Sequence, residues 1–321
     1  MSEVRNSVVN NRKATVVGAG FVGSSSAFAL LQSGLFSEIV LLDANTDKAE
    51  GEAMDIAHGA PFVGNVRVSA GTYDDIMDAG IIVVTAGAAQ KPGETRLDLI
   101  HKNVAIFQSI IPEIAKRHYQ GILLIVANPV DILTRVAMKL SGMPEGRVFG
   151  SGTVLDTARL KSELGAHLNV DARSVHAFIV GEHGDSEIAA WSCANVSGIP
   201  LSDFCEMRGY YNHQTSMEKI ADDVRNSAYR IIEKKHATYY GIAMSVTRIC
   251  RAVMMDEKSI LPVSVTVRNR YGIGESVLSL PAIVGAAGVE TLPPFRLSEE
   301  EQAKIRESAK TLNDIFDSLA L

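Results

Sequence analysis

The chain has 321 residues, of which 46% are hydrophobic, and a formal net charge of -6. This length and composition predict one large or two medium-sized domains with a substantial core. The negative charge argues against a nucleic-acid partner and an anionic membrane, and no apolar run approaches the roughly 20 residues of a membrane helix. The N-terminal segment lacks the apolar core of a signal peptide, so we expect a cytoplasmic protein.

The three cysteines, Cys193, Cys205 and Cys250, are odd in number and form no C-x-x-C pair. We therefore expect reduced thiols, as in cytosol, and no disulfide framework. No cluster of cysteine and histidine has the spacing of zinc ligands, so we expect no metal site.

In the first half of the chain, short apolar runs alternate with helical patterns. The runs that predict strands are 14–20, 38–43, 65–71, 80–87 and 121–129. Helical patterns follow the first two of these runs, one ended by Gly34 and the next with Thr46 as a plausible N-cap. Strands this apolar, with helices between them, predict an α/β fold of the Rossmann type, a doubly wound parallel sheet covered on both faces.

The second half has a different pattern, which predicts a mixed α+β domain. Its predicted helices are 153–168, a long stretch over 216–255, and a final helix that begins with a capping box of Ser298 and Glu301. Its predicted strands are 175–181, 190–198 and the antiparallel hairpin of 261–267 with 276–285. The apolar face of the final helix comprises Ile305, Ala309, Leu312, Phe316 and Leu319. We expect an N-terminal arm over 1–12, a first domain over 13–150 and a second over 151–321.

The run "VVGAGFVG" places Gly18, Gly20 and Gly23 in G-x-G-x-x-G spacing between a predicted strand and a predicted helix. Gly18 permits the tight turn, Gly20 lets the backbone approach a pyrophosphate, and Gly23 lets the helix pack on the strand. Asp43 follows 20 positions after Gly23, at the end of the next strand, where a carboxylate accepts hydrogen bonds from ribose hydroxyls. Because no arginine follows it in "DANTD", we expect NAD as the cofactor and not NADP.

Three candidate catalytic residues lie in the second predicted domain. Two are on its first predicted helix, and one follows the next predicted strand. His183, in "VGEHGDSE", lies between two glycines after an apolar run, which leaves room for a substrate around the ring; a loop histidine bonded to backbone is the alternative. Asp156 and Arg159 are three positions apart and share one helix face, which also fits an ordinary surface ion pair. In a partly buried cleft, that carboxylate would orient His183 and that guanidinium would bind a substrate carboxylate with two hydrogen bonds.

Asn128 ends the fifth predicted strand, where ligands bind in parallel sheets, although a turn residue before Pro129 would look the same. Thr238 and Ile242, in "HATYYGIA", are four positions apart on a predicted helix. Solvent exposure for Thr238 and core packing for Ile242 are the alternatives to a role in a site.

Six motifs in order, "GAGFVG", "TAGAAQKPGETRLDL", "ANPVD", "GTVLDTARL", "GEHGD" and "HATYYGIA", resemble the bacterial L-lactate dehydrogenases of the lactate/malate dehydrogenase superfamily. The resemblance covers nearly the whole chain, from about Lys13 to the final helix. It implies reversible hydride transfer between NADH and pyruvate. His183 would be the acid/base, Asp156 would orient it, Arg159 would bind the substrate carboxylate and Arg96 would polarise the carbonyl.

The same resemblance implies further contacts. Asn128 would contact the reacting oxygen and the nicotinamide region, Thr238 would line the pocket beside the substrate methyl group, and Ile242 would pack against the nicotinamide. The residues expected to contact the cofactor are Gly18, Gly20, Phe21, Val22, Gly23, Asp43, Ala86, Gly87, Asn128 and Ile242.

The segment 86–97 would be a lid that closes over the substrate, with Gly87 and Gly93 as hinges. Gln90 would read the far end of the substrate, where malate dehydrogenases carry an arginine that pairs with the second carboxylate of oxaloacetate. An uncharged Gln90 therefore favours pyruvate, while the neighbouring Lys91 supplies a cation on the same loop.

Many bacterial relatives are activated by fructose bisphosphate through an arginine and a histidine. His176 matches that histidine and Lys161 takes the place of the arginine, which keeps the charge but loses the bidentate fork. We expect an anion site of reduced affinity, with ordinary surface groups as the alternative. The family also implies a homotetramer, or a dimer that tetramerises.

Three other functions compete with this interpretation. Malate dehydrogenase shares the chemistry on a diacid, and Gln90 argues against it. An NAD-dependent glycosidase would need a metal, commonly held by a cysteine and a histidine, and no suitable pair is evident. A non-catalytic NAD-binding protein would leave His183, Asp156, Arg159 and Arg96 unexplained.

Overall fold

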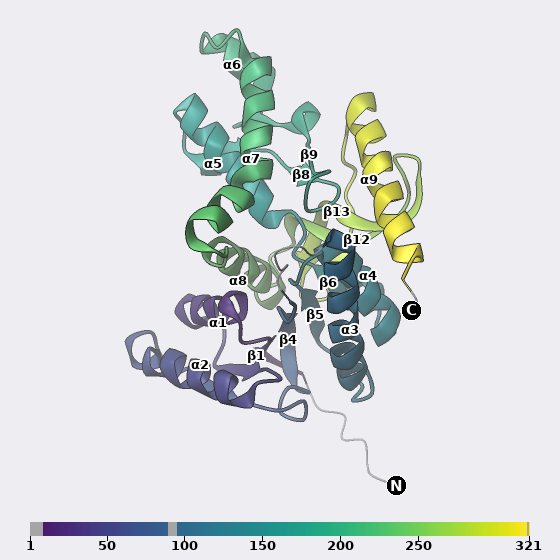
Figure 1. Cartoon of the computed structure of the whole chain (residues 1–321). Coiled ribbons are helices and arrows are strands. Elements are labelled where there is room, and N and C mark those ends of the chain that lie inside the picture. Colours follow the sequence, from purple (N-terminus) through teal and green to yellow (C-terminus); the bar gives the residue numbers. More distant parts are fainter. Residues whose placement is uncertain (1–8, 89–94, 320) are drawn as a thin grey trace.

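The computed structural model describes residues 9–88, 95–319 and 321 (Figure 1). Within the described residues, no helix combines the length and apolarity that crossing a bilayer requires. Residues 10–12, which we had assigned to an N-terminal arm, already belong to the first strand, and the start of that arm lies outside the described residues.

The first half of the chain alternates strands and helices, as its apolar periodicity predicts. The elements are β1 (Asn10–Val17), α1 (Phe21–Ser33), β2 (Glu38–Leu42), α2 (Thr46–His58), η1 (Ala60–Phe62), β3 (Arg67–Ala70), β4 (Ala79–Val84), α3 (Arg96–Ala115), β5 (Ile122–Ile125), α4 (Val130–Ser141), η2 (Glu145–Arg147) and β6 (Val148–Gly150). Helix α1 ends where Gly34 adopts a left-handed conformation, as expected. The predicted cap of α2 is off by one residue, because Asn45, not Thr46, accepts the hydrogen bond from the Lys48 backbone.

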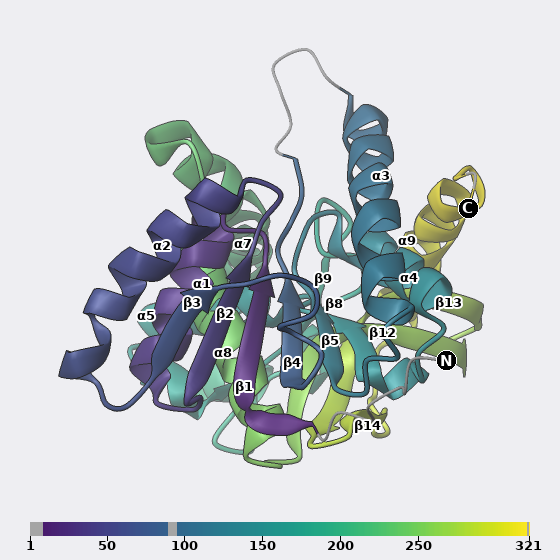
Figure 2. The same ribbon diagram turned by 90° about the horizontal axis from the view of Figure 1, so that it is seen from below.

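These strands form a parallel sheet in the order β3-β2-β1-β4-β5-β6, so the chain reverses direction across the sheet between β1 and β4. Helices α1 and α2 lie on one side of the sheet and α3 and α4 on the other (Figure 2). This doubly wound arrangement confirms the predicted α/β fold. It also places the carboxyl ends of β1 and β4 at the point of reversal, where ligands bind in such sheets.

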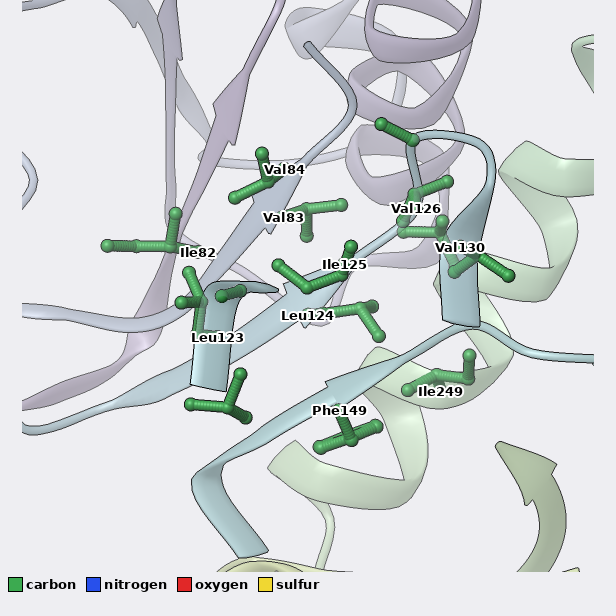
Figure 3. Close-up of a cluster of buried hydrophobic side chains, with 14 of the residues drawn as sticks. Ile82, Val83, Val84, Leu123, Leu124, Ile125, Val126, Val130, Phe149 and Ile249 are labelled. Carbon is green, nitrogen blue, oxygen red and sulfur yellow. The ribbon is translucent and has the colours of Figure 1, made fainter. Parts of the chain in front are cut away.

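The central strands are buried on both faces, which explains their continuous apolar sequence. Ile82 and Val84 of β4, Leu124 of β5, Phe149 of β6 and Ile249 from the second half meet in one hydrophobic cluster (Figure 3). At about 25 cal/mol for each Å² of apolar surface removed from water, such side chains are the main source of the fold's stability.

The second half combines helices with short strands and one long hairpin. Its elements are α5 (Val154–Leu168), η3 (Ala172–Ser174), β7 (Val175–His176), β8 (Ile179–Val180), β9 (Ile188–Ala189), η4 (Trp191–Cys193), β10 (Asn195–Val196), β11 (Ile199–Pro200), α6 (Leu201–Met207), α7 (His213–Lys235), α8 (Tyr240–Met254), β12 (Ser259–Arg270), β13 (Ile273–Gly285), β14 (Gly288–Thr291) and α9 (Glu299–Asp317). Ser298 and Glu301 form the predicted capping box of α9, and Ile305 is fully buried on its apolar face.

Three predictions for the second half are wrong in detail. The run 175–181, expected to be one strand, is divided between the two-residue strands β7 and β8, which belong to different sheets. The long helix expected over 216–255 is broken into α7 and α8, because His236 takes a left-handed conformation that ends α7. The run 190–198, expected to be one strand, contains the helical turn η4 followed by the two-residue strand β10.

The hairpin β12–β13 extends the parallel sheet of the first half. β12 pairs antiparallel with β6 at Ser264 and Gly150, which gives one nine-stranded sheet from β14 to β3. The boundary that we place at 150/151 therefore falls at a junction within a continuous sheet.

Candidate active site

A glycine turn joins β1 to α1 at the centre of the sheet. Gly18 has φ +105°, a conformation that disfavours other residues, and a Cβ atom there would lie 2.6 Å from the Ala86 backbone nitrogen. A Cβ atom at Gly23 would lie 1.7 Å from the Gly18 carbonyl oxygen. Gly20 is different, because nothing lies within 4 Å of its Cβ position. Two of the three glycines therefore serve the fold, and Gly20 leaves open space.

Asp43, at the end of β2, is tied to this turn. Its Oδ2 atom accepts a hydrogen bond of 2.6 Å from the Ala19 backbone, and its Oδ1 atom accepts one of 2.9 Å from the Asn45 backbone. Each carboxylate oxygen can accept a second hydrogen bond, so the carboxylate can still bind a ligand's hydroxyl groups.

A cavity of about 640 Å³ opens between these elements. Its lining includes Gly18, Gly20, Asp43, Thr72, Ala86 and Gly87. The N-terminus of α1 begins at this turn with no side-chain cap and no acidic residue in its first turn. Unpaired N–H groups at a helix N-terminus attract phosphates, and Asp43 suits a ribose, so this cavity fits a dinucleotide.

The other residues expected to contact the cofactor surround this turn. Phe21 is 70% exposed, and its ring stacks on Tyr239 with ring centroids 5.4 Å apart. Val22 is half-buried against the core. Ile242, in the first turn of α8, also packs against the core, and Thr238 lies in the segment between α7 and α8.

A second site is built around the carboxylate of Asp156, which is 2% exposed. Its Oδ2 atom lies 2.6 Å from Nδ1 of His183, and its Oδ1 atom accepts a hydrogen bond of 2.8 Å from Nη1 of Arg159. The structure thus joins His183 to the Asp156–Arg159 pair, the arrangement that the sequence analysis expected for a partly buried cleft. With Asp156 ionised, Nδ1 of His183 carries a hydrogen and Nε2 is the nitrogen left for a substrate.

The charges around this carboxylate support each other. Burial opposes the ionised form of Asp156, but the charges of His183 and Arg159 and their hydrogen bonds outweigh it and lower its pKa. Burial likewise opposes the protonated form of His183, but Asp156 outweighs it and raises the pKa of His183 to about 9. His183 therefore favours its protonated form at neutral pH.

The backbone of His183 is hydrogen-bonded to Asp131, a residue that the sequence analysis did not single out. Asp131 is 2% exposed, and its Oδ2 atom accepts a hydrogen bond of 2.8 Å from the His183 backbone. The hydroxyl group of Ser264 donates to its other oxygen. Burial raises the pKa of Asp131 to about 6. A sequence signal for Asp131 was present, because a charged residue within the apolar pattern of α4 indicates a buried carboxylate with a specific partner.

Asn128 lies at the end of β5, before a cis peptide bond to Pro129. Its carbonyl oxygen accepts a hydrogen bond of 2.7 Å from the side chain of Asn103, whose Oδ1 atom accepts one of 2.7 Å from the Ala88 backbone. Asn103 is almost fully buried on α3. It joins the segment after β4 to the strand end that carries Asn128.

A cavity of about 420 Å³ lies over this constellation. Its lining includes Asn128, Asp156, Arg159, His183, Glu187 and Arg225. Neither Thr238 nor Ile242 is among the lining residues. Glu187 and Arg225 were missed in the sequence, although Glu187 follows His183 by four positions.

Gln90 and Lys91 lie outside the described residues, as does Gly93, and the side chain of Arg96, the first residue of α3, is not described. Lys161 on α5 is half-buried, and burial lowers its pKa. His176 is exposed at the end of β7.

Comparisons with known proteins agree with this geometry. Residues 12–150 match the model of the lactate/malate dehydrogenase NAD binding domain, and residues 153–320 match that of the lactate/malate dehydrogenase alpha/beta C-terminal domain. The chain belongs to the lactate/malate dehydrogenase family. This membership confirms the resemblance that the six motifs indicate, and with it NAD as the cofactor.

Relatives within this family are similar over nearly their whole length. L-lactate dehydrogenase 1 of Clostridium acetobutylicum is 52% identical over 309 residues, covering 96% of this chain and 99% of the relative. L-lactate dehydrogenase of Thermoanaerobacterium saccharolyticum is also 52% identical, over 307 residues, with the same coverage. The ligand-bound crystal structure of minor L-lactate dehydrogenase from Enterococcus mundtii has a TM-score of 0.92 and 43% identity, covering 97% of this chain and 99% of that one.

Proposed function

We propose that this protein interconverts pyruvate and L-lactate, with His183 exchanging the proton and Arg159 binding the substrate carboxylate. The activity itself rests on family membership and on similarity to L-lactate dehydrogenases: the chain is an NAD-dependent oxidoreductase of L-lactate and pyruvate. The malate dehydrogenase alternative is not favoured, since these relatives are L-lactate dehydrogenases. The observation that supports the residue roles is the carboxylate of Asp156, which binds His183 and Arg159 at once.

The bound nicotinamide supplies or accepts the hydride, and the protein supplies position and charge. As pyruvate is reduced, negative charge grows on its carbonyl oxygen, and protonated His183 donates a proton to that oxygen from Nε2. Asp156 keeps the hydrogen on Nδ1 and stabilises the charged ring. Arg159 uses Nη1 for Asp156, which leaves Nη2 and Nε for the substrate carboxylate.

The remaining roles are proposals that rest on the resemblance. Gly20 and Asp43 bind the pyrophosphate and a ribose, while Asn128 and Ile242 contact the nicotinamide region. Thr238 contacts the substrate methyl group in this proposal, although it is not among the residues that line the cavity described above. Arg96 polarises the carbonyl, and Gln90 selects pyruvate over a diacid.

We also propose a homotetramer in the cytoplasm, with an activating anion such as fructose bisphosphate bound by Lys161 and His176. The three unpaired cysteines fit a reducing compartment. A lysine and a histidine supply the positive charge that a phosphate group requires, without the fork of an arginine.

The first measurement is NADH oxidation with pyruvate and with oxaloacetate, side by side, at equal concentrations. We expect kcat/KM for pyruvate to exceed that for oxaloacetate by at least an order of magnitude, because rejection of a second, unpaired carboxylate is costly. Preference for oxaloacetate would overturn the role of Gln90. A failure to reduce either acid while NADH binds would overturn the roles of His183 and Arg159.

A further inference from the structure

Glu187 is a second buried carboxyl group at the active site, and the mechanism above does not use it. It lies immediately before β9, and its backbone donates a hydrogen bond of 3.1 Å to the carbonyl oxygen of Gly184. The residue is 6% exposed. Its Oε1 atom is buried and has no hydrogen-bond partner among the described residues. An isolated buried carboxylate is costly, so an unpartnered one calls for an explanation.

The carboxyl group of Glu187 is close to both partners of the catalytic pair. A carboxylate oxygen of Glu187, one of Asp156 and a ring nitrogen of His183 all lie within 4.8 Å of one another. Asp156 already binds two cationic groups, so it offers Glu187 no compensation, only a like charge. At such distances two carboxylates do not both ionise freely, and the less well-partnered group keeps its proton.

Glu187 also separates two cavities. It lines the substrate cavity with His183 and Arg159, and it lines a neighbouring cavity of about 700 Å³ between α7 and α9, with Arg225 shared by both. The charged groups around it are Asp156 and Arg159 on α5, His183 and Asp185 on the loop before β9, Arg225 with Glu218 and Asp222 on α7, and Glu300, Glu301 and Lys304 on α9. The guanidinium of Arg225 donates a hydrogen bond of 2.7 Å to Asp222, which divides its charge between the two acids.

We propose that Glu187 regulates the charge of the substrate site: its neutral form permits binding of the substrate carboxylate at Arg159, and its ionised form opposes that binding. This inference rests on the proposed function, because it presumes an anionic substrate at Arg159. Glu187 is a positioning residue that acts through the field at the site, and it exchanges no proton with the substrate.

The electrostatics of the buried group agree with this geometry. Burial, followed by the negative charge of Asp156, raises the pKa of Glu187 to about 8. The positive charges of His183, Arg225 and Arg159 oppose this rise and do not cancel it. Glu187 is therefore mostly neutral at pH 7 and mostly ionised at pH 9, where His183 is about half protonated.

The test is the pH profile of KM for pyruvate in the wild type, Glu187→Gln and Glu187→Met. In the wild type we expect KM to rise roughly tenfold between pH 7 and 9, since one group with a pKa near 8 must be neutral for binding. Both variants lack the titrating group, so their KM should rise only a few-fold over that range. Glu218→Gln is the matched control, because it removes the same charge from the neighbouring cavity alone and should follow the wild type.

A second readout needs neither substrate nor cofactor. Infrared difference spectra of the protein between pH 7 and 9 should show the loss of a protonated-carboxyl band, and that band should be missing from both Glu187 variants. A KM profile of the variants that superposes on the wild type, or a band that persists in them, would overturn the role of Glu187. If the wild type reduces no pyruvate but shows the band, the proposed function fails while the titration of Glu187 stands.

Discussion

At the scale of single residues, Asp156 is the side chain on which the site depends. Replacing it with Asn keeps the shape but removes the charge that holds His183 protonated. We expect kcat/KM for pyruvate in Asp156→Asn to fall on the order of 10²- to 10⁴-fold. Asp171→Asn, which alters an exposed carboxylate paired with Arg173, should leave it unchanged.

The same variant should shift the pH dependence in a defined direction. In the proposed mechanism pyruvate reduction needs protonated His183, so the wild-type kcat at saturating pyruvate should decline only as pH rises through about 9. In Asp156→Asn, burial lowers the pKa of His183 against only the weaker opposing effects of Asp131 and Glu187, and the decline should begin at lower pH. Lactate oxidation needs neutral His183, so its acid limb should move to lower pH as well. Profiles of kcat at saturating substrate in both directions check this, and an unmoved alkaline limb would contradict the role of Asp156.

Substrate choice is also argued at this scale. Gln90→Arg should raise the ratio of kcat/KM for oxaloacetate over pyruvate by roughly tenfold or more, because a charged pair within a site contributes about 1.5–3 kcal/mol. Lys91→Gln is the control for the neighbouring cation. If the ratio in Gln90→Arg stays at its wild-type value, Gln90 does not read the far end of the substrate.

At the scale of elements, a substitution at the start of α1 can distinguish an effect on folding stability from an effect on cofactor binding. Gly20→Ala has room for its Cβ atom, so unfolding should become easier by no more than about 1 kcal/mol, the loss of a good N-cap. The added methyl group enters the cavity expected to hold the pyrophosphate, so the Kd for NADH should rise at least tenfold. Fluorescence titration with NADH measures this. Gly51→Ala, in the middle of α2 with open space around it, should raise stability and leave NADH binding unchanged.

The elements also show what sequence reasoning reaches. The strands β1, β2, β4 and β5 were predictable because their apolar runs reflect burial on both faces. The break between α7 and α8 was not, because one left-handed residue, His236, interrupts a pattern that remains helical on either side. Two-residue strands such as β7 and β8 carry too little periodicity to delimit.

Within the site, the residues that carry chemistry in their immediate sequence context were found, and those that act across the fold were not. His183, Asp156 and Arg159 stand in motifs. Asp131, in "ANPVD", and Glu187, in "VGEHGDSE", also stand in quoted motifs, but their importance depends on burial, distance and missing partners, and these are properties of the folded chain.

At the scale of the whole molecule, one sheet runs through both halves. We expect unfolding in denaturant to be a single transition, because the hairpin β12–β13 continues the sheet of the first half. Fluorescence of Trp191, the only tryptophan, reports on the second half, and far-UV circular dichroism reports on both. The two transitions should coincide at a fixed protein concentration. A Trp191 transition at lower denaturant than the circular dichroism transition would show that the halves unfold separately.

Activation by a sugar bisphosphate belongs to this scale as well, because the proposed site would join subunits. Millimolar fructose bisphosphate should lower KM for pyruvate several-fold, and Lys161→Arg should lower the activator concentration needed, since it restores a bidentate fork. Lys161→Gln should abolish the effect without changing the basal kcat. Pyruvate titrations unaffected by the bisphosphate at pH 6 and pH 7 would refute the site.

The pairing of Gly150 with Ser264 also affects whether the two halves of the chain can evolve separately. The segments 12–150 and 153–320 match two separate family models. Because one sheet runs through both, we expect neither segment to fold on its own. Separated from β6, the strand β12 would present an open edge whose side chains are buried on both faces, a template for aggregation. A half taken from a relative would have to bring a matching sheet edge with it. The β6–β12 junction therefore favours evolution in which the two halves are inherited together and change together.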